Sequence, residues 1–93
     1  MKYFEWNEEK NEKLKNERNI SFEIIVGQIE LGHLLDIVEQ PNKEKYANQN
    51  IYVVEYEKYA YLVPFVEDSD KVFLKTIIPS RKATKKYLRG GDE

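Results

Sequence analysis

The chain has 93 residues, of which 41% are hydrophobic and 34% are charged, and its formal net charge is −2. This length suits one small domain, and this composition excludes an intrinsically disordered chain. No apolar run approaches the roughly 20 residues that a membrane span requires, and the lack of cysteine excludes disulfides, thiolate zinc sites and cysteine nucleophiles. We therefore expect one cytoplasmic domain over residues 1–93, with no secretory signal and no membrane partner.

The first third of the chain predicts a strand followed by two helices. Residues 2–6 are aromatic and alternating, which is typical of a short strand. Asn7 is a suitable N-cap for a helix over about residues 8–18, and Ser21 is one for a second, amphipathic helix. The first helix has only Leu14 as an apolar anchor, so we expect most of it to face solvent or a partner.

The rest of the chain predicts three successive antiparallel strands and a terminal helix. Residues 33–38 form an earlier strand, and residues 51–56, 60–66 and 72–78 are strongly β-prone runs joined by short links. A helix begins at about Ser80. The predicted fold is therefore α+β, with a β-α-α start, an antiparallel sheet in the form of a meander, and a C-terminal helix.

Two further expectations concern the interior of this fold. Pro64 lies within a β-prone run and has no N–H to donate, which predicts a bulge or a missing ladder partner there. The apolar faces of the second helix and of the strands predict a core. We expect its largely buried members to be Trp6, Phe22, Ile25, Ile29, Val53, Leu62, Val63, Leu74 and Ile77.

The charges of the chain are unevenly distributed. Residues 71–89 contain seven basic residues and no acid, whereas the remainder has eight basic residues and seventeen acidic ones. Such an asymmetry favours an anionic partner for the basic end, although a solvated helix face gives the same count.

The terminal helix concentrates this positive charge on one face. At 100° per residue, one side of the helix carries five cations, which are Arg81, Lys82, Lys85, Lys86 and Arg89. Capping by Ser80 places the first two in the first turn, where cations oppose the helix dipole unless an anion is bound. Lys75 precedes them on a strand, on the same predicted sheet face as Phe73 and Ile77. These residues predict a phosphate site, and the alternative is a solvated basic face with the Lys75 stem lying along the sheet.

Two segments resemble the signature blocks of the BrnT family, which are toxins of bacterial type II toxin–antitoxin pairs with a fold similar to RelE-type ribonucleases. The segments are FEWNEEKNEKLKNERNISFE at 4–23 and IIPSRKATKKY at 77–87. The matching positions are Phe4, Trp6, Lys10, Ile20, Ser21, Phe22, Glu23, Arg81, Lys82, Ala83 and Thr84. The departures are Asn7 for an aspartate, Arg18-Asn19 for a His-Gly pair, and Pro79-Ser80 for a Ser-Ala pair.

The resemblance implies an endoribonuclease toxin that needs neither metal nor cofactor. It also implies a cognate antitoxin, usually a ribbon-helix-helix DNA-binding protein, through which the toxin would reach operator DNA. An alternative function is a catalytically silent binding module that docks nucleic acid or an antitoxin through the basic helix.

RNA cleavage without metal requires cations at the phosphate, a base for the 2′-hydroxyl and an acid for the leaving oxygen. We expect Arg81 and Lys82 to stabilise the charge, and Lys75 to do the same or to act as the acid. Expected RNA contacts are Lys85, Lys86, Arg89 and, by stacking on a base, Tyr46. The base stays open among His33, Glu55, Glu67 and Tyr61.

Overall fold

Each helix begins after a capping side chain in the computed structural model, which describes residues 3–42, 44–45 and 49–89. Asn7, Ser21 and Ser80 accept hydrogen bonds from the backbone N–H three residues later, at 2.9, 3.2 and 3.0 Å respectively. The helices are α1 (Glu8–Arg18), α2 (Phe22–Glu30) and α3 (Arg81–Leu88). The predicted helix starts are confirmed.

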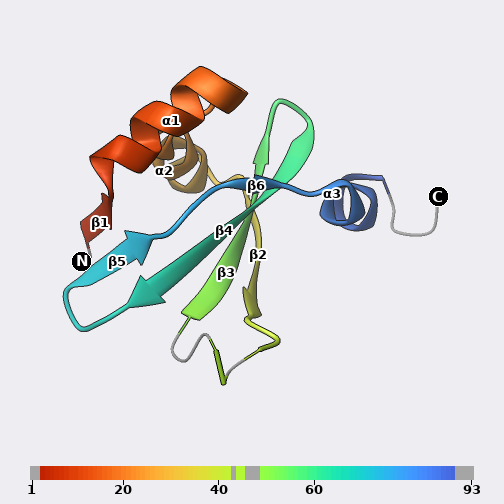
Figure 1. The fold of residues 1–93 in the computed structure, drawn as a ribbon. Helices are drawn as coiled ribbons and strands as arrows, with labels where there is room; N and C mark the ends of the chain where they lie inside the picture. The colour runs from red at the N-terminus through yellow and green to blue at the C-terminus, as the bar shows by residue number, and fades with distance from the viewer. Residues whose placement is uncertain (1–2, 43, 46–48, 90–93) are drawn as a thin grey trace.

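One six-stranded sheet runs between the helices (Figure 1). Its strands are β1 (Tyr3–Trp6), β2 (Leu34–Glu39), β3 (Gln49–Tyr56), β4 (Tyr59–Glu67), β5 (Lys71–Leu74) and β6 (Ile78–Pro79). The order is β1-β5-β4-β3-β2, with β6 also pairing with β4. The antiparallel meander is confirmed, but β1 pairs with β5 in parallel, so the sheet is mixed rather than antiparallel throughout.

The predicted strand over residues 72–78 is interrupted. β5 pairs with residues 65–67 of β4 and β6 pairs with residues 61–62, so β4 changes its neighbour beside Pro64. This change falls where Pro64 has no N–H to offer, while its carbonyl accepts from the Lys75 N–H at 2.8 Å. Because the strand breaks, Lys75 is exposed whereas Ile77 is buried, and the expectation that they share a sheet face is wrong.

Helices cover both faces of the sheet, as Figure 1 shows, with α1 and α2 on one side and α3 on the other. The main core lies under α1 and α2. Six of the nine predicted core residues are buried, namely Phe22, Ile25, Val53, Val63, Leu74 and Ile77. The other three, Trp6, Ile29 and Leu62, are only partly buried, because they lie at the margins of their clusters.

Polar contacts as well as Leu14 hold α1 on the domain. Asn11 is fully buried; its side-chain carbonyl accepts from the Phe22 N–H at 2.8 Å and its amide donates to Glu23 at 2.7 Å. One end of α1 is fixed by Arg18, which donates to the Ile77 carbonyl at 3.0 Å. The outer face, with Glu9, Lys13 and Glu17, is exposed as predicted. None of the helices in the described part of the chain has the length and apolar character of a membrane span.

Candidate functional site

The peptide group of Ala60 fixes the start of α3 against β4. The Ser80 N–H donates to the Ala60 carbonyl at 3.0 Å, and the Ala60 N–H donates to the Thr84 hydroxyl at 2.8 Å. The Thr84 hydroxyl in turn donates to the Ser80 carbonyl at 2.7 Å. Tyr59 precedes Ala60 and Arg81 follows Ser80. These hydrogen bonds therefore bring the side chains of Tyr59 and Arg81 close to one another.

A tight turn sets the position of Tyr59. Glu57 and Lys58 link β3 to β4 with φ values of 52° and 64°, the left-handed pair that a two-residue hairpin of this type needs. Tyr59 is the first residue after the turn, and its ring packs edge-on against Tyr61 with centroids 5.7 Å apart. The turn therefore presents a supported aromatic ring beside α3.

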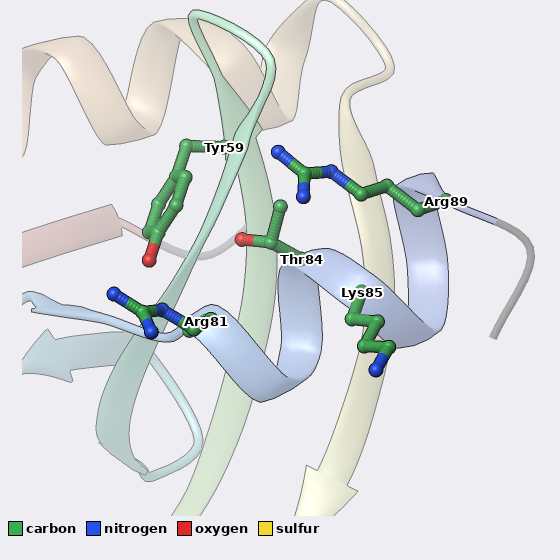
Figure 2. Close-up of a pocket in the computed structure, with 5 residues that line it drawn as sticks. All are labelled: Tyr59, Arg81, Thr84, Lys85 and Arg89. Atoms are coloured by element: carbon green, nitrogen blue, oxygen red, sulfur yellow. The ribbon is translucent and has the colours of Figure 1, made fainter. Parts of the chain in front are cut away.

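A cavity of about 580 Å³ lies between this ring and α3. We call it the arginine cleft, and it is lined by Tyr59, Arg81, Thr84, Lys85 and Arg89. Figure 2 shows the Tyr59 hydroxyl and the Arg81 guanidinium pointing toward one another, the Arg89 guanidinium reaching back toward Thr84 and Tyr59, and Lys85 pointing away. The volume is within the range of about 300–1,000 Å³ typical of small-molecule sites.

The arginine cleft is electrostatically suited to an anion. Its lining includes three cationic side chains and, among the described residues, no carboxylate. Arg81 lies in the first turn of α3, where the backbone N–H groups add positive potential. Guanidinium groups remain charged at all physiological pH values and bind phosphate in a planar, bidentate manner. Two guanidinium groups and a phenol thus converge on a space that would accept a phosphate with an attached ring.

A second, smaller hollow of about 210 Å³ lies on the other side of α3. We call it the apolar hollow, and it is lined by Val38, Val53, Leu62, Ser80, Lys82, Ala83, Lys86 and Tyr87. We call the apolar residues Val38, Val53, Leu62 and Ala83 its floor and the exposed cations Lys82 and Lys86 its rim. The structure therefore separates the two first-turn cations, because Arg81 lines the arginine cleft whereas Lys82 lines the apolar hollow.

A hydrogen bond beside the apolar hollow joins α3 to β2. The Tyr87 hydroxyl donates to an Asp36 carboxylate oxygen at 2.6 Å. This bond is the main reason why the pKa of Asp36 lies below its ordinary value and that of Tyr87 lies above it. The pair therefore favours an ionised carboxylate and a neutral phenol.

The remaining predicted site residues lie elsewhere. Lys75 is exposed, with its ammonium group 5.6 Å from the centre of the Phe73 ring, and it is not among the lining residues of either hollow. The Lys86 ammonium lies 5.2 Å from the Tyr87 ring centre, on the side of the apolar hollow. Tyr46 falls outside the described residues. Of the expected cations, the arginine cleft thus brings together Arg81, Lys85 and Arg89.

The candidate bases are also outside the lining of the arginine cleft. His33 and Glu55 lie together, with Nδ1 and Oε1 3.7 Å apart. Burial, and then the Glu57 carboxylate, raises the pKa of Tyr61, which keeps its phenol protonated and makes it less suited to be a base. Glu67 is an exposed residue at the end of β4.

Sequence reasoning missed Tyr59 and Thr84. The sequence does contain a sign of the position of Tyr59. A two-residue link between β-prone runs predicts a hairpin, and the residue after the link lies next to its turn. Thr84 was recognisable in the sequence only as a position of the family resemblance, with no role attached to it. Its contact with Ala60 depends on how α3 docks on β4, and no local pattern encodes that docking.

Comparisons with protein-family models, with curated proteins and with solved structures found no match for this chain.

Proposed function

We propose that this protein is the toxin of a type II toxin–antitoxin pair and cleaves single-stranded RNA in the arginine cleft without a metal ion. The observation that carries the proposal is the convergence of Arg81, Arg89 and Tyr59 on one cavity. RNA presents a phosphate and an aromatic base at each nucleotide. Guanidinium groups bind the phosphates, and an aromatic ring stacks on a base. In this assignment Arg81 and Arg89 bind phosphates, and the Tyr59 ring contacts a base.

The resemblance to the BrnT family supports the same proposal at one further position. Asn19 stands where that family has glycine, and it ends α1 in a left-handed conformation with φ of 58°. Glycine and asparagine are the residues that most readily adopt this conformation. The substitution therefore preserves the backbone requirement at the junction of α1 and α2.

The proposed reaction is an internal transfer at phosphorus. The RNA 2′-oxygen forms a bond to phosphorus, the bond from phosphorus to the 5′-oxygen breaks, and a 2′,3′-cyclic phosphate and a 5′-hydroxyl result. The 2′-hydroxyl loses its proton to a base and the leaving oxygen gains one. Arg81 and Arg89 stabilise the extra negative charge on phosphorus. Tyr59 and Lys85 are the residues of the described lining whose side chains can transfer protons in enzymes. The Tyr59 hydroxyl faces Arg81 whereas Lys85 points away, so we assign a proton transfer to Tyr59.

The test is cleavage of a mixed-sequence single-stranded RNA by purified protein in the presence of EDTA. We expect products with 2′,3′-cyclic phosphate ends, a loss of about a hundredfold in rate for Arg81→Ala, and a smaller loss for Tyr59→Phe. Lys58→Ala is the matched control, because this exposed cation lies at the hairpin turn next to Tyr59 but does not line the cleft. Equal rates in wild type and Arg81→Ala would refute the assignment.

Salt dependence of RNA binding separates the cations on the two sides of α3. Removal of one phosphate contact lowers the slope of log K against log salt by roughly one unit. We expect this change for Arg81→Ala and Arg89→Ala, and a smaller one for Lys82→Ala, because Lys82 faces the apolar hollow. An equal change for Lys82→Ala would show that RNA follows the whole cationic helix face rather than the arginine cleft.

A second candidate is an RNA-binding module without catalysis. It is favoured by the described lining of the cleft, which contains no carboxylate and no imidazole to act as a strong base. In that case RNA would bind in the arginine cleft, with the same dependence on Arg81 and Arg89, and would stay intact over long incubation.

A further inference from the structure

The two faces of the sheet are covered to different degrees. Under α1 and α2, eleven buried residues of the described ranges form the main core, with eight partly buried apolar neighbours around them. Under α3 the cluster has three buried members, Val53, Ala60 and Ala83. Five apolar neighbours remain only partly buried, and these are Leu35, Val38, Leu62, Tyr87 and Leu88. Apolar surface is therefore left open on the α3 face, around the apolar hollow.

The size of the apolar hollow indicates what kind of group it would take. Its volume of about 210 Å³ is below the range of about 300–1,000 Å³ that is typical of small-molecule sites. The floor formed by Val38, Val53 and Leu62 offers contact to an apolar group. A single large side chain of a protein partner fits these two properties better than a cofactor or a metabolite does.

The charges at the rim of the apolar hollow indicate which residues of the partner would flank the inserted side chain. Lys82 and Lys86 are exposed, one helical turn apart, and both line the apolar hollow. The nearby Asp36 carboxylate accepts the Tyr87 hydroxyl at 2.6 Å and also interacts with the Lys86 charge, which leaves two cations against one carboxylate around the hollow. A partner segment with carboxylates on either side of its apolar residue would therefore complement this rim.

We infer that the apolar hollow is the docking site for an acidic segment of a partner protein, which inserts one large apolar side chain between α3 and β2. The apolar side chain packs on Val38 and Leu62, and the flanking carboxylates pair with Lys82 and Lys86. This surface is separate from the arginine cleft, since the two lie on opposite sides of α3. The inference does not depend on whether the protein cleaves RNA.

The experiment uses the full-length chain and a synthetic, fluorescently labelled peptide in which acidic residues flank one leucine. Two comparison peptides have serine in place of the leucine, or lysines in place of the acids. We expect the parent peptide to bind about tenfold more tightly than either. In ¹⁵N–¹H NMR spectra the parent peptide should shift the amide signals of Val38, Leu62 and Ala83 more than those of Tyr59 and Arg89.

Two variants test the site on the protein. Val38→Asp places a negative charge at the hollow and should weaken the peptide about tenfold while RNA binding and cleavage stay unchanged. Lys86→Glu should weaken the peptide by a similar factor. Lys58→Glu is the matched control because it reverses an exposed charge at the hairpin turn, away from the hollow, and it should leave peptide affinity within about twofold. Thermal melts establish that each variant is folded.

Three results would overturn the inference. The first is equal affinity for the leucine and serine peptides, which would reduce the contact to charge alone. The second is a set of NMR shifts centred on the arginine cleft. The third is a dimer of the chain that Val38→Asp converts to a monomer, because a second copy would then occupy the hollow. Loss of RNA cleavage in Arg81→Ala, with peptide binding retained, would leave the inference intact and show that the two sites are independent.

Discussion

The Thr84 hydroxyl accepts a hydrogen bond from the backbone N–H of Ala60 at 2.8 Å, and both residues are buried. This contact joins the helix that carries Arg81 to the strand that carries Tyr59. The shape of the arginine cleft therefore depends on Thr84, an uncharged residue whose hydroxyl holds α3 against β4.

Replacing Thr84 with valine should destabilise the protein by roughly 1–3 kcal/mol, because the buried Ala60 N–H loses its acceptor while the side-chain shape is kept. Urea unfolding measures this loss. Thr84→Ser, which keeps the hydroxyl, should retain most of the stability. RNA affinity of the folded Thr84→Val protein should also fall, since one of the two hydrogen bonds between Ala60 and the start of α3 is lost. A valine variant as stable as wild type would contradict the role of this bond.

Asn11 should matter more for stability than its place on a charged helix suggests. Its side chain is fully buried and joins α1 to the start of α2, so Asn11→Ala should cost roughly 1–3 kcal/mol. Asn16→Ala is the control, because Asn16 is an exposed asparagine on the same helix. Chemical denaturation of both variants should show a large change for the first and almost none for the second.

Truncation of Leu74 tests the placement of β5 in the core. Leu74 is fully buried, and Leu74→Ala should lower the free energy of unfolding by roughly 2–5 kcal/mol. Leu31→Ala removes the same atoms from a side chain that is 73% exposed and should have little effect. A melt of Leu74→Ala that matches the parent would show that β5 is wrongly placed.

The bond between Asp36 and Tyr87 should contribute stability only within a pH window. The pKa of Asp36 is lowered from 3.8, so its contribution is present above this value and is lost as the pH falls through the folded pKa. The pKa of Tyr87 is raised from 10.0, so its contribution is present below this value and is lost as the pH rises through the folded pKa. The difference in unfolding free energy between wild type and Tyr87→Phe should therefore shrink at both extremes. A difference that is constant with pH would exclude the bond.

The elements that the sequence predicts best are those with a local cause. Ser80 caps α3 within its own first turn, and the apolar side of that helix follows from its period of 3.6 residues. The break in the strand beside Pro64 was only half predictable. The missing N–H is visible in the sequence, but the exchange of β5 for β6 as the neighbour of β4 depends on long-range pairing.

The candidate site was predictable in its charge but not in its shape. Arg81 and Arg89 are recognisable as cations of one helix face, and both line the arginine cleft. Whether a given cation of that face meets Tyr59 or Val38 depends on how α3 sits on β4, because adjacent residues such as Arg81 and Lys82 diverge to its two sides. That orientation depends on hydrogen bonds from α3 to the backbone of Ala60, and nothing about an alanine in the sequence indicates this role.

The parallel pairing of β1 with β5 also bears on the order in which the domain can assemble. Tyr3 to Trp6 align with Lys71 to Leu74, so β1 is synthesised well before the strand with which it pairs. The helices α1 and α2 are likewise made before the strands that they cover. Contacts between such distant segments slow folding. Until Leu74 emerges, the apolar side of α2 has no complete sheet to pack against, and the nascent chain therefore exposes Phe22 and Ile25 over the interval in which residues 26–74 are made.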